Sequence, residues 1–137
     1  MNGIKMSDCK FYVNEEKRTI VCVIPNTEDM VIDFILQHFQ FSDFDFYDGL
    51  IFGGHYSLVE QITMPSSFIG KAVCAENDDW NEELGRKIAF SRAKDKCYKS
   101  FFKRANIFVQ AIDGHLGDII EKFNDFGLKL ENKRETL

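Results

Sequence analysis

The chain has 137 residues, of which 45% are hydrophobic, and a formal net charge of −5. That length fits a single domain, 1–137, and no stretch reaches the roughly 20 consecutive apolar residues of a membrane span. The acidic balance argues against a protein that coats duplex nucleic acid, because such proteins need a broadly basic surface. We therefore expect one soluble, intracellular domain.

The cysteines and phenylalanines set two further expectations. Cys9, Cys22, Cys74 and Cys97 are scattered and form no C-x-x-C pair, which favours free thiols in a reducing compartment. The fourteen phenylalanines are a heavy aromatic load for one small core. Self-association would cover aromatic surface that the core cannot hold.

The N-terminal half predicts a hairpin and a short helix. Two β-rich runs, 10–13 and 19–24, flank a polar segment and predict an antiparallel β-hairpin. Apolar residues at helical spacing predict an amphipathic helix over 28–39. Residues 41–54 interleave aromatic residues with aspartates, and this run could be a strand pair or an insertion packed by its aromatics. We interpret the wider segment 27–62 as an insertion.

The C-terminal half begins with a strand and continues as helix. The run 67–75 predicts a strand with a break at Gly70. Asp79 followed by Glu82 matches a capping box and predicts where the next helix begins. Helical apolar spacing continues as far as Gly114, which is typical of a helix end.

A second, shorter helix is expected around 116–123, with Gly127 as its end and a polar tail over 131–137. The predicted fold class is therefore α+β. It consists of a small antiparallel sheet, the hairpin plus one further strand, packed on a long C-terminal helix that is followed by a shorter helix. The apolar arc of the long helix is wide enough to pack on the sheet and on a partner, so we expect dimerisation through these helices.

A basic island covers residues 86–104 and has a net charge of +7, with eight basic residues and the single acid Asp95. The rest of the chain has nine basic and 21 acidic residues, a net charge of −12. A compact anion would be attracted to this island and repelled elsewhere. The basic residues are Arg86, Lys87, Arg92, Lys94, Lys96, Lys99, Lys103 and Arg104.

Projection onto a helix places Arg92, Lys96, Lys99 and Lys103 on one strip. Such a strip can bind phosphate groups, because arginine forks match phosphate oxygens and lysine adds point charge. It can equally be a solvated face whose long side chains cover apolar surface. Spacing alone does not separate these two interpretations.

Catalytic and metal-binding patterns are missing from the sequence. His38, His55 and His115 are far apart, and no Cys/His cluster, Walker loop or G-x-S-x-G motif is present. We expect no metal, no cofactor and no enzyme activity. Phe68, Trp80 and Phe90 could stack on a nucleobase, although core packing is the commoner role of each.

Residues 68–96 contain a longer pattern: a strand with G-x-A-x-C, a D-x-[WF]-[ND]-x-E-x-G turn, and a helix with K-[IL]-A-x-x-R-A-x-x-K. Its elements are Gly70, Ala72, Cys74, Asp78, Trp80, Glu83, Gly85, Lys87, Ile88, Ala89, Arg92, Ala93 and Lys96. The pattern is similar to that of the phage Thoeris anti-defence sponge proteins. Members of that family sequester a cyclic ADP-ribose signalling nucleotide without cleaving it, in sites at a dimer interface.

The resemblance implies a ligand-binding protein of the host cytoplasm that assembles as a homodimer or higher oligomer. Phosphates would bind the basic strip and the base would stack on aromatic residues. The candidate ligand-binding residues are Phe68, Lys71, Asn77, Trp80, Arg86, Phe90, Arg92 and Lys96.

Three other functions are open on sequence grounds. The acidic-aromatic run 41–48 favours a protein-directed inhibitor, such as an anti-CRISPR that mimics nucleic acid. Nucleic-acid binding through the basic helix is a further alternative, and it would weaken steeply with salt. A phosphodiesterase ranks last because no metal cluster or general-base pair stands out.

Overall fold

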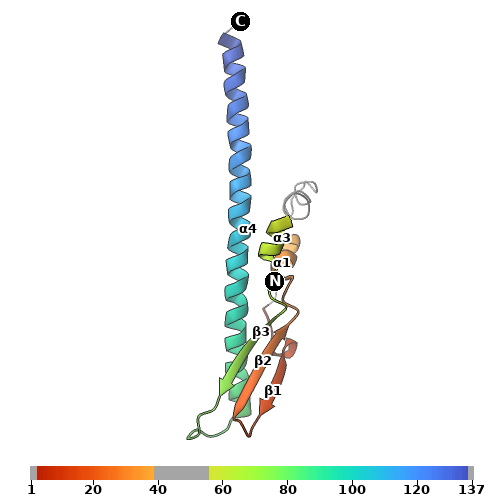
Figure 1. Ribbon diagram of the computed structural model, residues 1–137, viewed down its shortest axis with the longest axis vertical. Coiled ribbons are helices and arrows are strands. Elements are labelled where there is room, and N and C mark those ends of the chain that lie inside the picture. Colours follow the sequence, from red (N-terminus) through yellow and green to blue (C-terminus); the bar gives the residue numbers. More distant parts are fainter. Residues whose placement is uncertain (1–2, 39–55, 136–137) are drawn as a thin grey trace.

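The computed structural model describes residues 3–38 and 56–135 and has an α+β fold, as predicted. Figure 1 shows a small sheet and short helices beside a long helix that runs the full length of the molecule. The elements are the 3-10 turn η1 (Met6–Asp8), β1 (Lys10–Asn14), β2 (Thr19–Pro25), α1 (Met30–His38), α3 (Tyr56–Ile62), β3 (Ser67–Val73) and α4 (Glu82–Glu135). The strands form an antiparallel sheet in the order β1-β2-β3.

The β1–β2 hairpin is confirmed, and its loop is set by local hydrogen bonds. Asn14 pairs with Thr19, and the Lys17 amide donates to Asn14 Oδ1 at 3.0 Å. The Arg18 amide donates to the Glu15 carbonyl at 3.0 Å. Arg18 has a φ of 53°, a left-handed conformation that few non-glycine residues adopt. The turn therefore fixes the direction in which the Arg18 side chain leaves the loop.

The sheet packs on α4 through small residues. Ile20, Cys22 and Ile24 form the buried face of β2. Gly70 of β3 lies against the α4 backbone, where a Cβ would come 2.1 Å from the Ala89 carbonyl oxygen and 2.3 Å from the Ala93 nitrogen. The predicted break at Gly70 is wrong: β3 pairs with β2 through Gly70, and the glycine is needed for this close approach.

The two short helices complete the core. Val31 and Ile35 of α1 and Leu58 and Ile62 of α3 are buried with Phe101 and Phe108 of α4. Phe34 meets Phe101 edge to face, with ring centroids 5.6 Å apart. The helix predicted over 28–39 is thus confirmed as Met30–His38, while the interpretation of 27–62 as an insertion stays a prediction.

The start of α4 differs from the prediction by two residues. Asn81 caps the helix: its Oδ1 accepts the Leu84 amide at 3.1 Å and its carbonyl accepts the Gly85 amide at 3.0 Å. Asp79 lies before the cap, so the predicted capping box of Asp79 and Glu82 is wrong. Aspartate and asparagine are both common N-cap residues, so sequence spacing alone did not distinguish Asp79 from Asn81.

The predicted end of the long helix at Gly114 is also wrong. A glycine ends a helix when it adopts a positive φ, and none of the described glycines does so. Gly114 and Gly117 stay helical, and α4 continues through residues 116–123 to Glu135. The separate shorter helix and the break before it are therefore not found.

Replacing Gly70 by Ala should lower the free energy of unfolding by about 2 kcal/mol, because β3 and α4 would have to move apart. Gly114→Ala is the matched control, since its methyl group would meet nothing within 4 Å. It should raise helix stability by roughly 0.5–1 kcal/mol. Urea denaturation followed by circular dichroism measures both changes. Equal effects at the two positions would contradict the close approach.

Asn81→Ala should cost about 1 kcal/mol of stability by removing the side-chain acceptor for Leu84. Asp79→Ala, two residues earlier, should change stability by less than about 0.5 kcal/mol. Thermal unfolding of the two variants compares them directly. A larger loss of stability in Asp79→Ala would show that Asp79, and not Asn81, caps the helix.

Candidate functional site

A pocket of about 450 Å³ lies where β3 leaves the sheet and α4 begins, and we call it the β3–α4 pocket. It collects residues from the β1–β2 loop, from β2 and β3, from the loop after β3 and from the first two turns of α4. Its lining consists of Arg18, Ile20, Ala72, Val73, Cys74, Asp78, Asp79, Trp80, Asn81, Leu84, Gly85 and Ile88.

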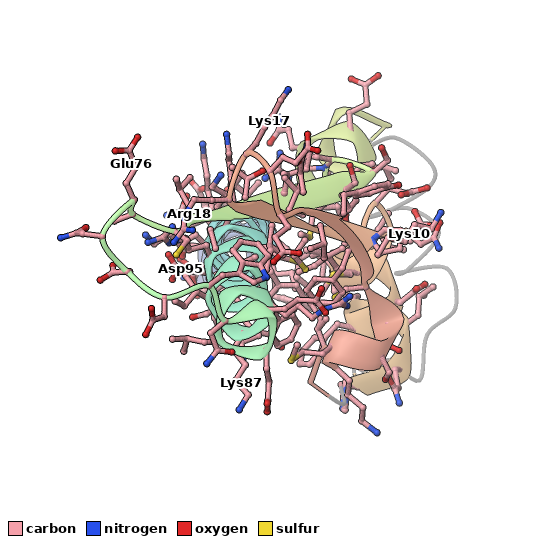
Figure 2. The ribbon with its side chains drawn as sticks, turned by 90° about the horizontal axis from the view of Figure 1, so that it is seen from below. Lys10, Lys17, Arg18, Glu76, Lys87 and Asp95 are labelled. Atoms are coloured by element: carbon pink, nitrogen blue, oxygen red, sulfur yellow. The ribbon has the colours of Figure 1, made fainter. Side chains whose placement is uncertain are left out.

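Arg18 holds two loops together at this pocket. Its guanidinium group donates to the Ala75 carbonyl at 3.0 Å, to the Asp78 carbonyl, and to Cys74 Sγ at 3.0 Å. The Arg18 carbonyl accepts the Cys74 amide at 2.9 Å. Figure 2 shows Arg18 at the base of the β3–α4 loop, with Glu76 pointing outward from the loop tip. Arg18 thus connects the hairpin turn to a loop about 56 residues later in the chain.

The pocket has an apolar wall and a polar end. Val73 and Leu84 are 63% and 53% exposed, and Trp80 is half-buried beside them. Arg18, Asp78 and Asp79 supply opposite charges at the loop end. A flat aromatic ligand could lie on the apolar wall while its polar groups reach the loops.

Arg92 and Lys96 lie along the free edge of β3. Among the described residues β3 pairs only with β2, so alternate carbonyls of β3 point outward from its other edge. Arg92 Nη1 donates to the Lys71 carbonyl at 2.7 Å, and Lys96 Nζ donates to the Ile69 carbonyl at 3.0 Å. These two cations therefore cover an edge that could otherwise pair with another strand.

Other cations of the basic island have nearby partners as well. Lys87 pairs with Glu83 at 3.4 Å and Lys99 with Asp95 at 3.1 Å, both one helical turn apart. Arg104 Nε donates to the Thr63 carbonyl at 3.0 Å, which joins α4 to the end of α3. Exposed ion pairs of this kind add little stability. Arg92, Lys96 and Arg104 thus attach the helix to its neighbours, whereas Lys87 and Lys99 pair within α4.

The structure brings four of the eight predicted site residues to one side of α4. Trp80 lines the β3–α4 pocket, and Ile88 in its wall lies one helical turn before Arg92. Lys96 follows one turn later, and Lys71 is the exposed β3 residue whose carbonyl Arg92 binds.

The other four predicted residues lie apart from this group. Arg86 stands over the Phe11 ring of β1, 5.0 Å from its centroid, and pairs with Glu82 at 3.3 Å. Phe90 lies one turn after Arg86, half-buried against the core, and Phe68 is half-buried against the core as well. Asn77 is exposed in the turn after β3.

Sequence reasoning missed Arg18 and the aliphatic wall. Arg18 lies in the polar segment between the two strands of the hairpin, and its hydrogen-bond acceptors follow dozens of residues later in the chain. A signal existed in the hairpin turn, where an arginine occupies a position that glycine or asparagine usually fills. Val73, Leu84 and Ile88 carried no such signal, because apolar residues at these spacings suggest core packing.

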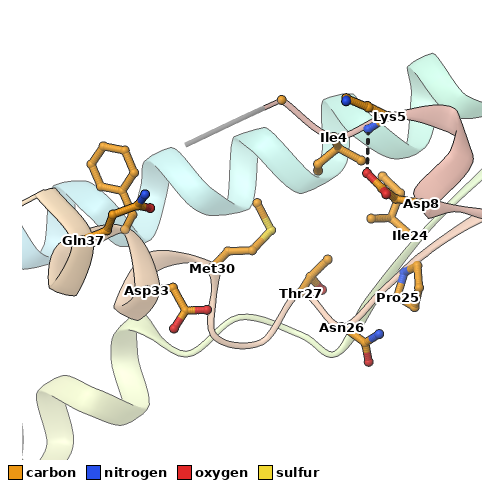
Figure 3. A pocket seen from close by; sticks show the side chains of 12 residues that line it. Ile4, Lys5, Asp8, Ile24, Pro25, Asn26, Thr27, Met30, Asp33 and Gln37 are labelled. Carbon is orange, nitrogen blue, oxygen red and sulfur yellow. Dashed lines mark hydrogen bonds between the residues drawn. The ribbon is translucent and has the colours of Figure 1, made fainter.

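A second pocket, of about 440 Å³, lies between the N-terminal segment, the end of β2 and α1. Figure 3 shows its mixed lining, with Lys5, Asp8, Asn26, Asp33 and Gln37 around Met30, and the bond from the Lys5 amide to Asp8 Oδ2. None of the predicted site residues lines this pocket.

All four cysteines are free thiols in the structure. Burial raises the pKa of the Cys22 thiol to about 12 and that of Cys97 to about 11. Both are core residues that stay protonated near neutral pH. Across residues 3–38 and 56–135, no group of three or more His, Cys, Asp or Glu side chains is placed to hold a metal ion.

The acidic-aromatic run 41–48 lies outside the described residues. Within the described part of the chain, no helix combines the length and apolar character needed to cross a membrane. Comparisons with protein-family models, curated proteins and solved structures found no match for this chain.

Arg18→Gln should loosen the loop after β3 by removing the guanidinium bonds. Amide hydrogens of Cys74 and Asp78 should then exchange about 10-fold faster. Lys17→Gln makes the same kind of change in the same turn at an exposed side chain, and should leave those rates unchanged. Unaltered exchange in Arg18→Gln would show that the loop is held by other contacts.

Proposed function

We propose that this protein is a phage anti-defence protein that binds a cyclic ADP-ribose-type immune signalling nucleotide in the β3–α4 pocket and sequesters it uncleaved. One observation supports this above the others. Of the thirteen motif residues that resemble the sponge proteins, six line this single pocket. They are Ala72, Cys74, Asp78, Trp80, Gly85 and Ile88.

Five of the other seven motif residues hold β3 and α4 together beside the pocket, whereas Glu83 and Lys87 pair with each other on the exposed surface of α4. Gly70, Ala89 and Ala93 allow the close approach of β3 and α4. Arg92 and Lys96 bind the free edge of β3 next to the pocket. Eleven of the thirteen motif residues thus lie together, five in the packing of β3 on α4 and six in the pocket lining.

The size and chemistry of the pocket suit a nucleotide. Ligand pockets typically measure about 300–1,000 Å³, and this one measures about 450 Å³. A base would lie against Trp80 and the aliphatic wall, and phosphates would be attracted to Arg18 and Arg92. Asp78 and Asp79 would accept hydrogen bonds from ribose hydroxyls or an exocyclic amine. Retention needs only this complementarity, so the proposal assigns no catalytic residue.

The direct test incubates purified protein with a panel of signalling nucleotides, removes free ligand, denatures the protein by heat and analyses the supernatant by HPLC. Recovery of one intact cyclic ADP-ribose isomer supports the proposal. A cleaved product would contradict it and indicate an enzyme. An empty supernatant across the panel would also contradict it and favour the protein-directed inhibitor.

Val73→Glu should reduce nucleotide affinity by about 10- to 100-fold, because it places a negative charge in the pocket wall. Tyr12→Glu is the matched control: Tyr12 is 60% exposed against 63% for Val73, and it lies on β1, outside the pocket lining. Arg92→Ala should also abolish retention while the fold is kept. Isothermal titration calorimetry measures the nucleotide affinity of all three variants. Equal losses of affinity in Val73→Glu and Tyr12→Glu would show that the nucleotide does not bind in the β3–α4 pocket.

A further inference from the structure

The second pocket, of about 440 Å³, lies at the opposite end of β2 from the β3–α4 pocket, and we call it the N-terminal pocket. It is bounded by the N-terminal segment, by the end of β2 with the loop that follows it, and by α1. In Figure 3, Asp8 lies on one side of this pocket and Asp33 and Gln37 on the other, with Met30 between them.

The walls of the N-terminal pocket are held by hydrogen bonds within the protein. The Ile4 amide donates to the Tyr98 hydroxyl at 3.2 Å, which ties the N-terminal segment to α4. In the loop after β2, the buried Thr27 hydroxyl donates to the Pro65 carbonyl at 2.5 Å, and the Met30 amide donates to the Thr27 carbonyl at 3.3 Å. The pocket is therefore formed in advance, which lowers the entropic cost of binding a ligand.

The floor of the N-terminal pocket is apolar. Ile24 in the lining is a core residue, and the lining residues Ile4, Met30 and Phe34 pack against that core. A methionine side chain is flexible enough to adapt to the shape of a ligand. Covering such a surface with an apolar group is favourable because that surface is removed from water. The floor thus suits a ligand with an apolar body.

The charges around this floor favour a cation. The lining has the carboxylates of Asp8 and Asp33 and the single ammonium group of Lys5, a net charge of −1. Asp8 Oδ2 already accepts the Lys5 amide at 3.0 Å. The Asp33 carboxylate has no hydrogen-bond or ion-pair partner among residues 3–38 and 56–135. Gln37 lies one helical turn after Asp33 and supplies a further acceptor on the same side.

We propose that the N-terminal pocket binds a small organic cation, a primary amine with an apolar body. The ammonium group pairs with Asp33 and donates to the side-chain carbonyl of Gln37, while the body covers the floor around Met30. One positive charge neutralises the lining, whereas the phosphates of a nucleotide would be repelled by it. Amine binding is independent of the proposed nucleotide site, because the two pockets share no lining residue.

Three indole probes of similar size test the class of ligand: tryptamine is a cation, tryptophol is neutral, and indole-3-acetate is an anion. Isothermal titration calorimetry should show tryptamine binding at least about 10-fold more tightly than tryptophol, because only its ammonium group pairs with Asp33. Indole-3-acetate should bind more weakly than tryptophol. Equal affinities for the three probes would overturn the proposal.

Nuclear magnetic resonance of the isotope-labelled protein locates the tryptamine. The amide signals of Met30 and Asp33 should shift during the titration, since both residues line the N-terminal pocket. Shifts confined to Trp80 and Leu84 would place tryptamine in the β3–α4 pocket and would overturn the proposal.

Asp33→Asn keeps the shape of the side chain and removes its charge. It should lower the affinity for tryptamine by about 10-fold and leave that for tryptophol unchanged. Asp29→Asn is the matched control: it removes the same charge from an exposed residue just before α1, outside the pocket lining, and should leave both affinities unchanged. Equal losses in the two variants would reflect net charge alone and would overturn the proposal.

Gln37→Lys gives a second test that leaves Asp33 in place, because a carboxylate in the first turn of α1 also stabilises the start of the helix. The new ammonium group would pair with Asp33 one turn earlier and compete with the amine, lowering tryptamine affinity by about 10-fold. Gln61→Lys makes the same change at an exposed residue of α3, outside the lining, and should have no effect. Unchanged tryptamine binding in Gln37→Lys would contradict the assigned site.

Discussion

The close approach of β3 to α4 at Gly70 sets the geometry on which the rest of the structure depends. Here backbone meets backbone, with the Ala89 carbonyl and the Ala93 nitrogen against the glycine. This distance allows Arg92 and Lys96 to reach carbonyls on the outer edge of β3. It also leaves the β3–α4 pocket at the end of the contact, where strand and helix separate into a loop. A side chain at position 70 would therefore disturb three features together: the packing of β3 on α4, the bonds from Arg92 and Lys96 to the edge of β3, and the β3–α4 pocket.

Cations of the basic island can hold α4 against the domain or attract an anion, and net charge alone does not distinguish these two uses. Arg92, Lys96 and Arg104 donate to backbone carbonyls of β3 and of the segment after α3, so they attach the helix to the domain. A guanidinium group has five donors, and Arg92 uses one of its nitrogens for the Lys71 carbonyl. The same residue can therefore support the edge of β3 and present further donors to an anion beside the pocket.

The two ends of α4 have different surroundings. At its N-terminal end, small residues and a capped first turn hold the helix against the sheet and form one wall of the pocket. Toward its C-terminal end the helix extends beyond the other described elements (Figure 1), and its apolar residues Phe102, Val109 and Phe123 are exposed. The change falls at Phe101 and Phe102: Phe101 is buried in the core, and Phe102 is exposed to solvent.

The sequence by itself determined the α+β class, the hairpin and the short helix near residue 30, and it named Trp80 and Arg92, which the structure places on one side of α4. Alternating and helical spacings are local, and local patterns can be recognised along the chain. Tertiary structure alone decided that Gly70 is a packing position, that Asn81 is the cap, and that α4 continues through Gly114. By pairing β2 with β3 it also placed Arg18 beside Cys74, which lies 56 residues later in the chain. These outcomes depend on contacts between residues that are far apart in the sequence and on the backbone conformation that each glycine adopts in the folded chain. Local sequence patterns predict neither of these.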